Sequence, residues 1–351
     1  MINSMRKIIL TSVFVATAFT LGAQRTEAMS VQPQQGLSIE QVKDGLYAIM
    51  GSGGNVGVRV TSEGVILIDD KFPQNFADIQ ALVATVSDQP VRYVLNTHHH
   101  GDHASGGAVF ADTAQFVGHE NMLSHLALPP DSTPLPTDGQ YAIAATMDAN
   151  GDGRIEQSEA SGGILNNFSG FDANGDGELS GAEVLRGPLS AVHAPNITYS
   201  NSMVITLGGR EARLTWVGEF NHSMDMSVIS FPDERAMQVV DFITFQRLPF
   251  REMDFENGLF VEWMSAINHW ESIARGYDYI SPGHGPVGDV TDVREWRRYF
   301  EALRDAVAAG IAAGQSLEEM RASIEIPAYA DWEGYSWLDE NVLGMYHFLT
   351  D

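Results

Sequence analysis

The feature that most constrains this chain is a histidine-rich run at the end of an apolar segment. An apolar stretch that ends at Leu95 continues directly into Asn-Thr-His-His-His-Gly-Asp-His. Alternate side chains of a strand project to one face, so we expect His98 and His100 to point the same way and share one ion. Asp102 and His103 fall in the turn that follows, where they can reach a second ion. Neutral imidazoles and carboxylates are ligands that Zn and Fe prefer, so the run predicts a metal site at the end of a strand.

A chance histidine-rich tract, or a loose chelator on the surface, is the alternative interpretation of this run. Four ligand-type residues within six positions favour a metal site instead. His99 would point away from its neighbours if the strand continued, so we predict that it is not a ligand. The histidines without ligand-type partners nearby in the sequence are expected to be ordinary: His119, His125, His193, His269 and His347.

Length and composition indicate a globular, strongly acidic protein. The 351 residues suffice for a large buried core, and 44% apolar with 19% charged residues is typical of a folded chain. The formal net charge of -26 would repel a phosphate backbone, so we expect a small-molecule substrate and no nucleic-acid partner. The chain contains no cysteine, which excludes disulfides and thiolate ligands.

The first 28 residues are typical of a secretory signal peptide. Arg6 and Lys7 precede an apolar stretch, and small residues offer cleavage after Ala23 or Ala28. An uncleaved anchor is the alternative, but the stretch is short for a membrane span of about 20 residues. We therefore expect residues 29–351 to form a periplasmic or secreted protein with no membrane attachment after cleavage.

Two similar series of strands and helices predict the fold class. The first has three strands between residues 45 and 70, helices at 76–86 and 119–128, and strands at 91–95 and 114–118. The second has strands at 203–207, 212–217, 227–231, 236–240 and 279–281, and helices at 263–275 and 293–313. This order predicts an α/β (α+β) protein in which two mixed sheets pack face to face with helices outside, a four-layer αββα sandwich.

Between the two series, at residues 135–192, two near-copies of a calcium-binding loop appear. Both fit the EF-hand pattern, with oxygen ligands at alternate positions, Gly at position 6 and Glu at position 12. The predicted calcium ligands are Asp148, Asn150, Asp152, Arg154, Glu156 and Glu159 in the first loop, and Asp172, Asn174, Asp176, Glu178, Ser180 and Glu183 in the second. The pair predicts an inserted, EF-hand-like helical region that binds one or two Ca²⁺.

The spacing of these loops departs from ordinary EF-hand pairs. Only residues 160–171 remain for the exit helix of one loop and the entry helix of the next, so both helices must be truncated. Ile155 and Leu179 occupy the positions at which paired loops form a short β-contact. Calcium is abundant outside the cytoplasm, so we expect a structural rather than a sensor role.

Three further ligand-type residues, His222, Asp241 and His284, each follow an apolar strand in the second series. Together with the histidine-rich run they resemble the metallo-β-lactamase superfamily. The run from His98 to His103 matches its HxHxDH signature, and the three later residues match its other ligand positions. The resemblance spans about residues 45–288 apart from the insert, and extends to the branch of periplasmic and uncharacterised members.

This resemblance implies a binuclear zinc centre. The implied zinc ligands are His98, His100 and His222 for one ion, Asp102, His103 and His284 for the other, and Asp241 as the bridge. Two such ions hold a bridging hydroxide that attacks an ester, thioester, lactone or lactam-type bond without a protein nucleophile. Asp102 is then the catalytic residue that orients this hydroxide and takes its proton. The expected protein is an exported binuclear zinc hydrolase with a calcium-stabilised insert.

Other functions on the same fold stay open. Oxygen-reducing diiron relatives usually have Glu where His100 stands, and typical class B1 lactamases have Cys where Asp241 stands. A β-lactamase proper, a mononuclear iron oxygenase that resembles persulfide dioxygenases, and a calcium-dependent binding module are the alternatives. The turn after His222 lacks the usual Gly, and we expect Asp225 to support a ligating histidine there. Residues 51–54 are expected to form a strand turn rather than an edge of the active site.

Overall fold

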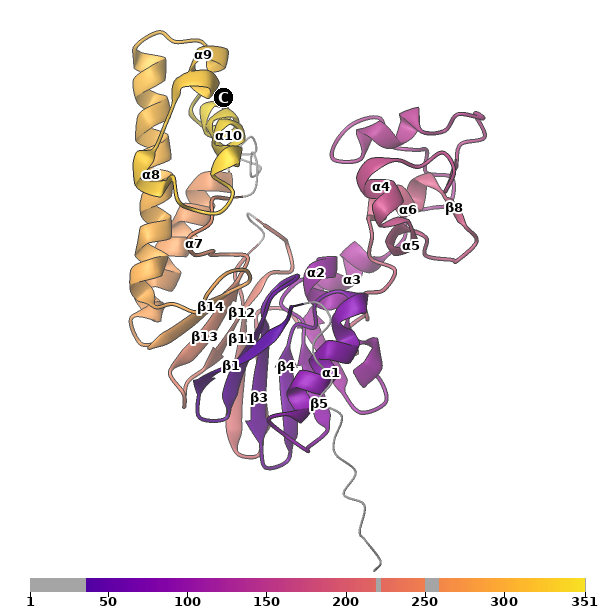
Figure 1. Ribbon diagram of the computed structural model, residues 1–351, viewed down its shortest axis with the longest axis vertical. Helices are drawn as coiled ribbons and strands as arrows, with labels where there is room; N and C mark the ends of the chain where they lie inside the picture. The colour runs from indigo at the N-terminus through magenta and orange to yellow at the C-terminus, as the bar shows by residue number, and fades with distance from the viewer. Residues whose placement is uncertain (1–35, 219–221, 250–258, 351) are drawn as a thin grey trace, which may run out of the picture. The chain divides into compact units, whose positions relative to one another are not determined.

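The computed structural model of the protein describes residues 36–218, 222–249 and 259–350 (Figure 1). All of these residues belong to one compact unit, 33–351. The predicted signal peptide, residues 1–28, lies outside the described residues. Among the described helices, none is both long enough and apolar enough to cross a membrane.

Seven strands form the first sheet, in the spatial order β1-β2-β3-β4-β5-β6-β9. They are β1 (Ser38–Lys43), β2 (Leu46–Met50), β3 (Val56–Thr61), β4 (Gly64–Ile68), β5 (Val91–Leu95), β6 (Gln115–His119) and β9 (Ile197–Tyr199). The first four pair antiparallel through short turns, whereas β4, β5, β6 and β9 pair in parallel. The predicted meander of three strands is confirmed, with β1 as an additional edge strand.

Burial on both faces explains the sequence of the central strands. All five residues of β4 are buried, and so are Val94 and Leu95 in β5. Parallel strands that are covered on both faces carry continuous apolar runs of this kind. Helix α1 (Phe76–Ala84) makes the crossover between β4 and β5, and its Ile79 packs against the outer face of the sheet.

Five strands form the second sheet, in the order β10-β11-β12-β13-β14. They are β10 (Ser202–Leu207), β11 (Arg210–Trp216), β12 (Ser227–Phe231), β13 (Ala236–Val240) and β14 (Tyr279–Pro282). Neighbouring strands pair antiparallel except β13 and β14, which pair in parallel. The predicted strands at 227–231 and 236–240 coincide with β12 and β13.

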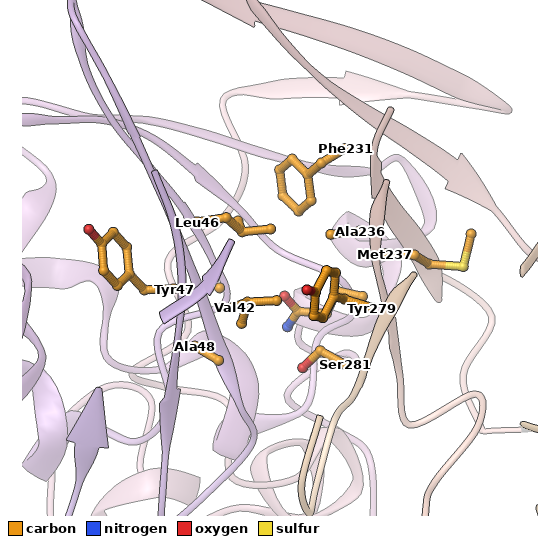
Figure 2. A pocket seen from close by; sticks show the side chains of 11 residues that line it. Val42, Leu46, Tyr47, Ala48, Phe231, Ala236, Met237, Tyr279 and Ser281 are labelled. Atoms are coloured by element: carbon orange, nitrogen blue, oxygen red, sulfur yellow. The ribbon is translucent and has the colours of Figure 1, made fainter. Parts of the chain in front are cut away.

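Apolar side chains from both sheets form the inner core of the molecule. Leu46, Ile66 and Ile68 of the first sheet share one buried cluster with Leu214 and Ile229 of the second. A small cavity of about 20 Å³ remains between the sheets, and Figure 2 shows the side chains around it. Its volume suits about one water molecule, and none of the predicted metal ligands lines it.

Helices cover the outer faces of the two sheets. Helix α1 lies on the first, and the cluster on the second contains side chains from α7, α8, α9 and α10. These helices are α7 (Leu259–Ala274), α8 (Val290–Ala312), α9 (Leu317–Ser323) and α10 (Leu338–Thr350). Figure 1 shows α10 beside α8, with which it is in contact. The layers run helix, sheet, sheet, helix, so the predicted αββα sandwich is confirmed.

The segment predicted as an insert has a small hydrophobic cluster of its own, in which Ile155, Phe171 and Leu179 are buried. Its elements are β7 (Ile155–Glu156), α4 (Gly162–Asn166), α5 (Phe168–Phe171), β8 (Glu178–Leu179) and α6 (Gly181–Arg186). The helices are as short as the loop spacing predicts. Strands β7 and β8 pair antiparallel with Ile155 opposite Leu179, which is the predicted β-contact.

Two short helices near the histidine-rich run complete the part of the fold that positions the site. Helix α2 (Gly101–Ala104) contains the end of the run, Asp102 and His103, and α3 (Asn121–Leu126) follows β6. The predicted helix at 119–128 therefore begins two residues late, because His119 is still paired in β6 with Tyr199 of β9.

Candidate metal centre

The three consecutive histidines of the run lie in a loop and not in a strand. Strand β5 ends at Leu95, and α2 begins at Gly101. Strand alternation is therefore the wrong explanation for the position of His98 and His100. Their rings nevertheless meet, with centroids 4.6 Å apart, because the backbone turns back on itself between β5 and α2. The short helix then presents Asp102 and His103 from its first turn.

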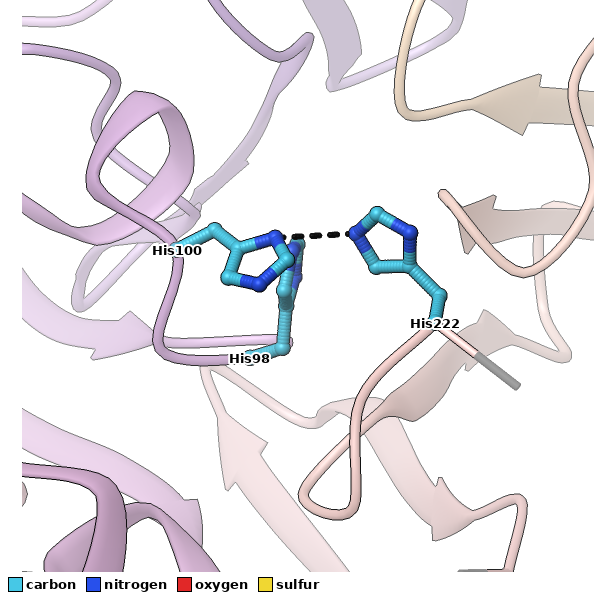
Figure 3. Close-up of side chains that lie close together, drawn as sticks. All are labelled: His98, His100 and His222. Carbon is cyan, nitrogen blue, oxygen red and sulfur yellow. Dashed lines mark hydrogen bonds between the residues drawn. The ribbon is translucent and has the colours of Figure 1, made fainter. Parts of the chain in front are cut away.

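A first group of imidazoles comes from two loops that are far apart in the sequence. Figure 3 shows His98 and His100 close to His222, a residue that follows β11 in the sequence. Nε2 of His222 is 2.9 Å from Nδ1 of His100, and the His98 and His222 rings are 5.1 Å apart. One nitrogen from each ring lies within 4.8 Å of the other two, a spacing that a single ion can bridge.

A second group consists of Asp102, His103 and His284. Oδ2 of Asp102 is 3.2 Å from Nε2 of His284 and 3.7 Å from Nε2 of His103. His284 follows β14, so this group also joins the two halves of the chain.

Asp241, which directly follows β13, lies between the two groups. Its Oδ2 atom is 3.3 Å from Nε2 of His222 in the first group. The same atom is 3.3 Å from Nε2 of His103 and 3.5 Å from Nε2 of His284 in the second. One carboxylate thus reaches ligand atoms of both groups.

Several buried atoms of the centre make no hydrogen bond to the described residues. They are Nε2 of His98, Nε2 of His103 and Oδ1 of Asp241. A buried polar atom that lacks a hydrogen bond costs about 1–3 kcal/mol, and a coordinated ion removes that cost. The donor set is nitrogen and carboxylate oxygen only, which suits zinc, iron or manganese. The residues present therefore fit two divalent ions.

Carboxylates and imidazoles at the centre shift one another's protonation. Burial lowers the pKa of His103, but the negative charges of Asp241 and Asp102 outweigh it and hold that pKa well above its usual value. Burial raises the pKa of Asp241, but positive charge on His103 and His284 outweighs it and holds that pKa well below its usual value. An ion takes the place of these protons, so metal binding releases protons and weakens as the pH falls.

Asp69, which the sequence analysis missed, supports two of the histidines. It directly follows β4 and is fully buried, and its Oδ2 lies 2.9 Å from Nδ1 of His103. The same carboxylate accepts hydrogen bonds from the backbone N–H and the hydroxyl of Thr97. The Thr97 hydroxyl in turn lies 3.2 Å from Nδ1 of His98. Both imidazoles then donate through Nδ1 and keep Nε2 for an ion.

Close approach of backbone to ligands requires glycine at two positions. A Cβ atom at Gly54 would overlap the ring of His103, and one at Gly283 would overlap the carboxylate of Asp241. Gly54 N also donates to the carbonyl of Asp102 at 2.9 Å. Residues 51–54 lie in the predicted turn between β2 and β3, but Gly53 and Gly54 also lie against Asp102 and His103, so the expectation that this turn does not edge the site is wrong.

The backbone is strained immediately before Asp241. Val240 has a φ of 54°, a conformation that β-branched residues rarely adopt and that costs about 1–3 kcal/mol. The strain occurs where β13 shifts register against β14, and the change in backbone direction there places the side chain of Asp241 between the two groups.

His99 belongs to neither group, although its ring centroid lies 4.7 Å from that of His100, and it contacts two residues from other segments. Its Nδ1 lies 3.0 Å from Oδ1 of Asp225, and its ring stacks on that of His125 at 3.8 Å. Asp225 was expected to support a ligating histidine, and this is wrong, because its carboxylate bonds to His99 and Ser223 instead. His125, expected to be ordinary, belongs to the same cluster.

The predicted calcium loops share one hydrogen-bonding pattern. Asp148 and Asp172, at position 1, accept hydrogen bonds from backbone N–H groups of the following turn. Oε1 of Glu159 and of Glu183, at position 12, accepts from the residue after position 1, at 3.0 and 2.9 Å. Gly153 and its counterpart Gly177, at position 6, have φ values of 87° and 86° that only glycine adopts without strain.

The layered fold and the two ligand groups define the class of protein, and comparison with known families agrees. Residues 50–284 match the model of the metallo-beta-lactamase superfamily, which is more than half of the chain. The chain belongs to this superfamily. With its His and Asp groups at the expected place, the protein is a metal-dependent hydrolase.

Solved structures of a sulfatase, with TM-scores above 0.5, show the same fold at low sequence identity. The stereoselective inverting sec-alkylsulfatase Pisa1 from Pseudomonas sp. is 16% identical, with a TM-score of 0.57 over 88% of this chain and 50% of that one. A double mutant of that sulfatase is 15% identical, with a TM-score of 0.59 over 90% and 50%. A metallo-beta-lactamase from Pontibacter korlensis is 16% identical, with a TM-score of 0.48 over 74% and 95%. The chain spans half the length of the sulfatases, and no curated protein matches it.

Proposed function

We propose that the protein is an exported binuclear zinc hydrolase that cleaves an ester, thioester, lactone or lactam-type bond in a small molecule. One observation carries the proposal. The Oδ2 atom of Asp241 lies within 3.5 Å of imidazole nitrogens from both ligand groups. That position is the one required of a carboxylate that holds two ions together. The proposed ligands are His98, His100 and His222 on one ion, and Asp102, His103 and His284 on the other.

Two bound zinc ions would supply an activated water and polarise the bond to be cleaved. The chain's own residues then have separate tasks. Asp102 is the more open of the two central carboxylates, with 28% of its side chain exposed against 9% for Asp241. Burial raises the pKa of Asp102, but the charge on His103 outweighs it and holds the pKa below its usual value. Asp102 is therefore ionised at neutral pH, and we assign it the orientation of the water and acceptance of its proton at a carboxylate oxygen.

A groove between the end of β11 and one face of α7 supports a substrate with an apolar portion. It has a volume of about 440 Å³, and Trp216, Val217 and Trp270 line it together with the polar residues Thr215, Ser265 and His269. Val217 also leads into the loop that carries His222. Apolar and aromatic walls with few polar groups are typical of small-molecule sites.

The experiment that tests this proposal replaces Asp241 by Asn. Asp241→Asn keeps the shape of the side chain but removes the charge shared by both groups. The metal held by these two groups and the hydrolysis should therefore be lost, while the circular dichroism spectrum stays unchanged. Asp233→Asn, an exposed carboxylate on the turn before β13, is the matched control and should retain both. Normal turnover and full zinc content in Asp241→Asn would refute the assignment.

The substrate is found by a hydrolytic panel on protein of verified metal content. It contains esters, thioesters, lactones, β-lactams and phosphodiesters, with alkyl sulfates added because of the fold shared with a sec-alkylsulfatase. Preferred cleavage of β-lactams would identify a β-lactamase proper. One iron per chain with oxygen consumption would favour the mononuclear oxygenase, and calcium alone would favour a binding module.

We also propose that the insert binds one or two calcium ions that stabilise it. The antiparallel pairing of β7 with β8, glycine at positive φ in position 6 of both loops, and glutamate turned back to the start of each loop support this assignment. The acidic composition and the charged, then apolar N-terminal sequence support export to the periplasm or medium.

A further inference from the structure

A third cluster of ligand-type side chains lies outside the two groups of the proposed zinc centre. It consists of His99, His125 and Asp225, with one ligand atom of each within 4.8 Å of the other two. The three come from separate segments: the loop after β5, helix α3 and the turn before β12. A local sequence pattern does not reveal this cluster, because His99 and Asp225 are 126 positions apart in the sequence.

The distances in the cluster approach those around a bound ion. Nδ1 of His99 is 3.0 Å from Oδ1 of Asp225, and Nε2 of His125 is 4.0 Å from the same oxygen. Ligand atoms at about 2.1 Å from a tetrahedral ion lie about 3.4 Å apart. The two rings stack almost parallel, at 8°, so a rotation of the His125 ring is needed to aim both nitrogens at one point. His125 stands in the last turn of α3 with 28% of its side chain exposed, which leaves it room to rotate.

One carboxylate oxygen of Asp225 lacks a hydrogen-bond partner among the described residues, which also favours a bound ion. The Asp225 side chain is fully buried, and its Oδ2 makes no hydrogen bond to any residue in the described ranges. Its Oδ1 meets His99 and the hydroxyl of Ser223. Oδ1 is the atom that faces both histidines, so an ion bound by both carboxylate oxygens would give Oδ2 a partner and take the place of the proton between His99 and Asp225. Ser223 Oγ, 3.3 Å from Nδ1 of His99, offers a further oxygen nearby.

We propose that His99, His125 and Asp225 form a separate site for one divalent transition-metal ion. Two imidazoles and one carboxylate favour zinc, copper or nickel over calcium or magnesium, which prefer oxygen ligands only. Such an ion cross-links the loop of His98 and His100 to the turn that follows His222, and so clamps the two segments that supply the first ligand group. The site adds to the proposed zinc centre, but its own three ligands do not depend on that centre.

The test counts zinc in the full-length protein. Parent and variants are stripped with chelator, equilibrated with excess zinc in the presence of calcium, desalted and analysed for zinc per chain. His125→Phe keeps a ring to stack on His99 but has no nitrogen ligand, and it should hold one zinc fewer than the parent. His193→Phe is the matched control, because His193 also stacks on a ring, that of Phe116, outside every ligand group among the described residues. The control should hold as much zinc as the parent.

The same comparison in the Asp241→Asn background separates this site from the proposed centre. If the cluster binds its own ion, His125→Phe removes one zinc in that background too, whether or not Asp241→Asn itself lowers the zinc content. Equal zinc content with and without His125→Phe in both backgrounds would overturn the proposal. Loss of all zinc from His125→Phe would overturn it as well, because His125 would then act by holding the loops rather than by binding a separate ion.

Discussion

Asp69 offers the sharpest test of how the centre is organised, because it is buried beside the ligands without touching the proposed ions. One of its oxygens lies 2.9 Å from Nδ1 of His103, and the carboxylate accepts two hydrogen bonds from Thr97. Asp69→Asn keeps the size of the side chain. Its amide can still accept from the Thr97 backbone, but an NH₂ group then faces the Nδ1–H of His103.

Because the two donors face each other, the His103 ring must either move or carry its proton on Nε2. A protonated Nε2 has no lone pair with which to bind an ion. A lost hydrogen bond to a charged group costs about 1.5–3 kcal/mol. Removing such an outer partner of a metal ligand lowers metal affinity about 10–100-fold, which agrees with that energy. We therefore expect Asp69→Asn to weaken binding of the ion held by Asp102, His103 and His284 by this factor, and the other ion less.

Zinc titration in competition with a chromophoric chelator measures the two binding steps separately. Asp70→Asn is the matched control, since Asp70 is also fully buried but accepts from the backbone N–H of Gly106. Burial raises the pKa of Asp70 well above its usual value, and among the described residues its carboxylate makes no hydrogen bond to a ligand histidine, so this variant changes a buried carboxyl group without removing a partner of His103. Unchanged affinity for both ions in Asp69→Asn would refute the hydrogen-bond argument, and an equal loss in Asp70→Asn would show that burial alone is responsible.

Two further predictions concern calcium and a buried lysine. Replacing Glu159 and Glu183 together by Gln should lower the melting temperature in 10 mM calcium but not in chelator. Each calcium site, with a dissociation constant of about 10⁻⁴ M, would contribute about 3 kcal/mol to the free energy of unfolding at that concentration. If calcium does not raise the melting temperature of the parent, the assignment of the loops is wrong. Burial lowers the pKa of Lys71 to about 8, so between pH 8 and the unfolded value near 10.5 the folded state holds fewer protons than the unfolded state, and stability rises with pH. In chelator, the free energy of unfolding measured with denaturant should therefore rise by about 3 kcal/mol more in the parent than in Lys71→Met across that pH range. A difference between the two proteins that does not change with pH would contradict this prediction.

The strands that sequence predicts best are those whose neighbours bury both faces. β5, β12 and β13 are short apolar runs between turn residues, and the predicted ranges coincide with the observed ones. The edge strand β1 was missed because its sequence, Ser-Ile-Glu-Gln-Val-Lys, leaves most positions exposed and shows no apolar run. An edge strand is defined by its pairing with β2, which a local pattern does not reveal.

The sequence pointed to the residues of the two ligand groups, but neither to the backbone path that gathers them nor to the cluster of His99, His125 and Asp225. His98 and His100 were assigned to a continuing strand, whereas the chain leaves β5 at Leu95 and turns. Asp69 was missed because its contact with His103 depends on the parallel pairing of β4 with β5 and on the turn after it. An acidic residue at the end of a buried strand next to the histidine-rich run was the available signal.

Folding of the sandwich does not have to wait for the ions, because the two halves are joined by contacts that need no metal. The inner core contains side chains of both sheets, and Arg59 of β3 forms a buried ion pair with Glu234, between β12 and β13. Each proposed ion, by contrast, takes ligands from both halves, so its site exists only once the sheets have packed. Asp241 and His103 stabilise each other's charged forms, since the carboxylate raises the pKa of His103 and the imidazole lowers that of Asp241, and a bound ion replaces this interaction. The centre is therefore assembled by the core, and the binding energy of the ions adds to a fold that has already formed.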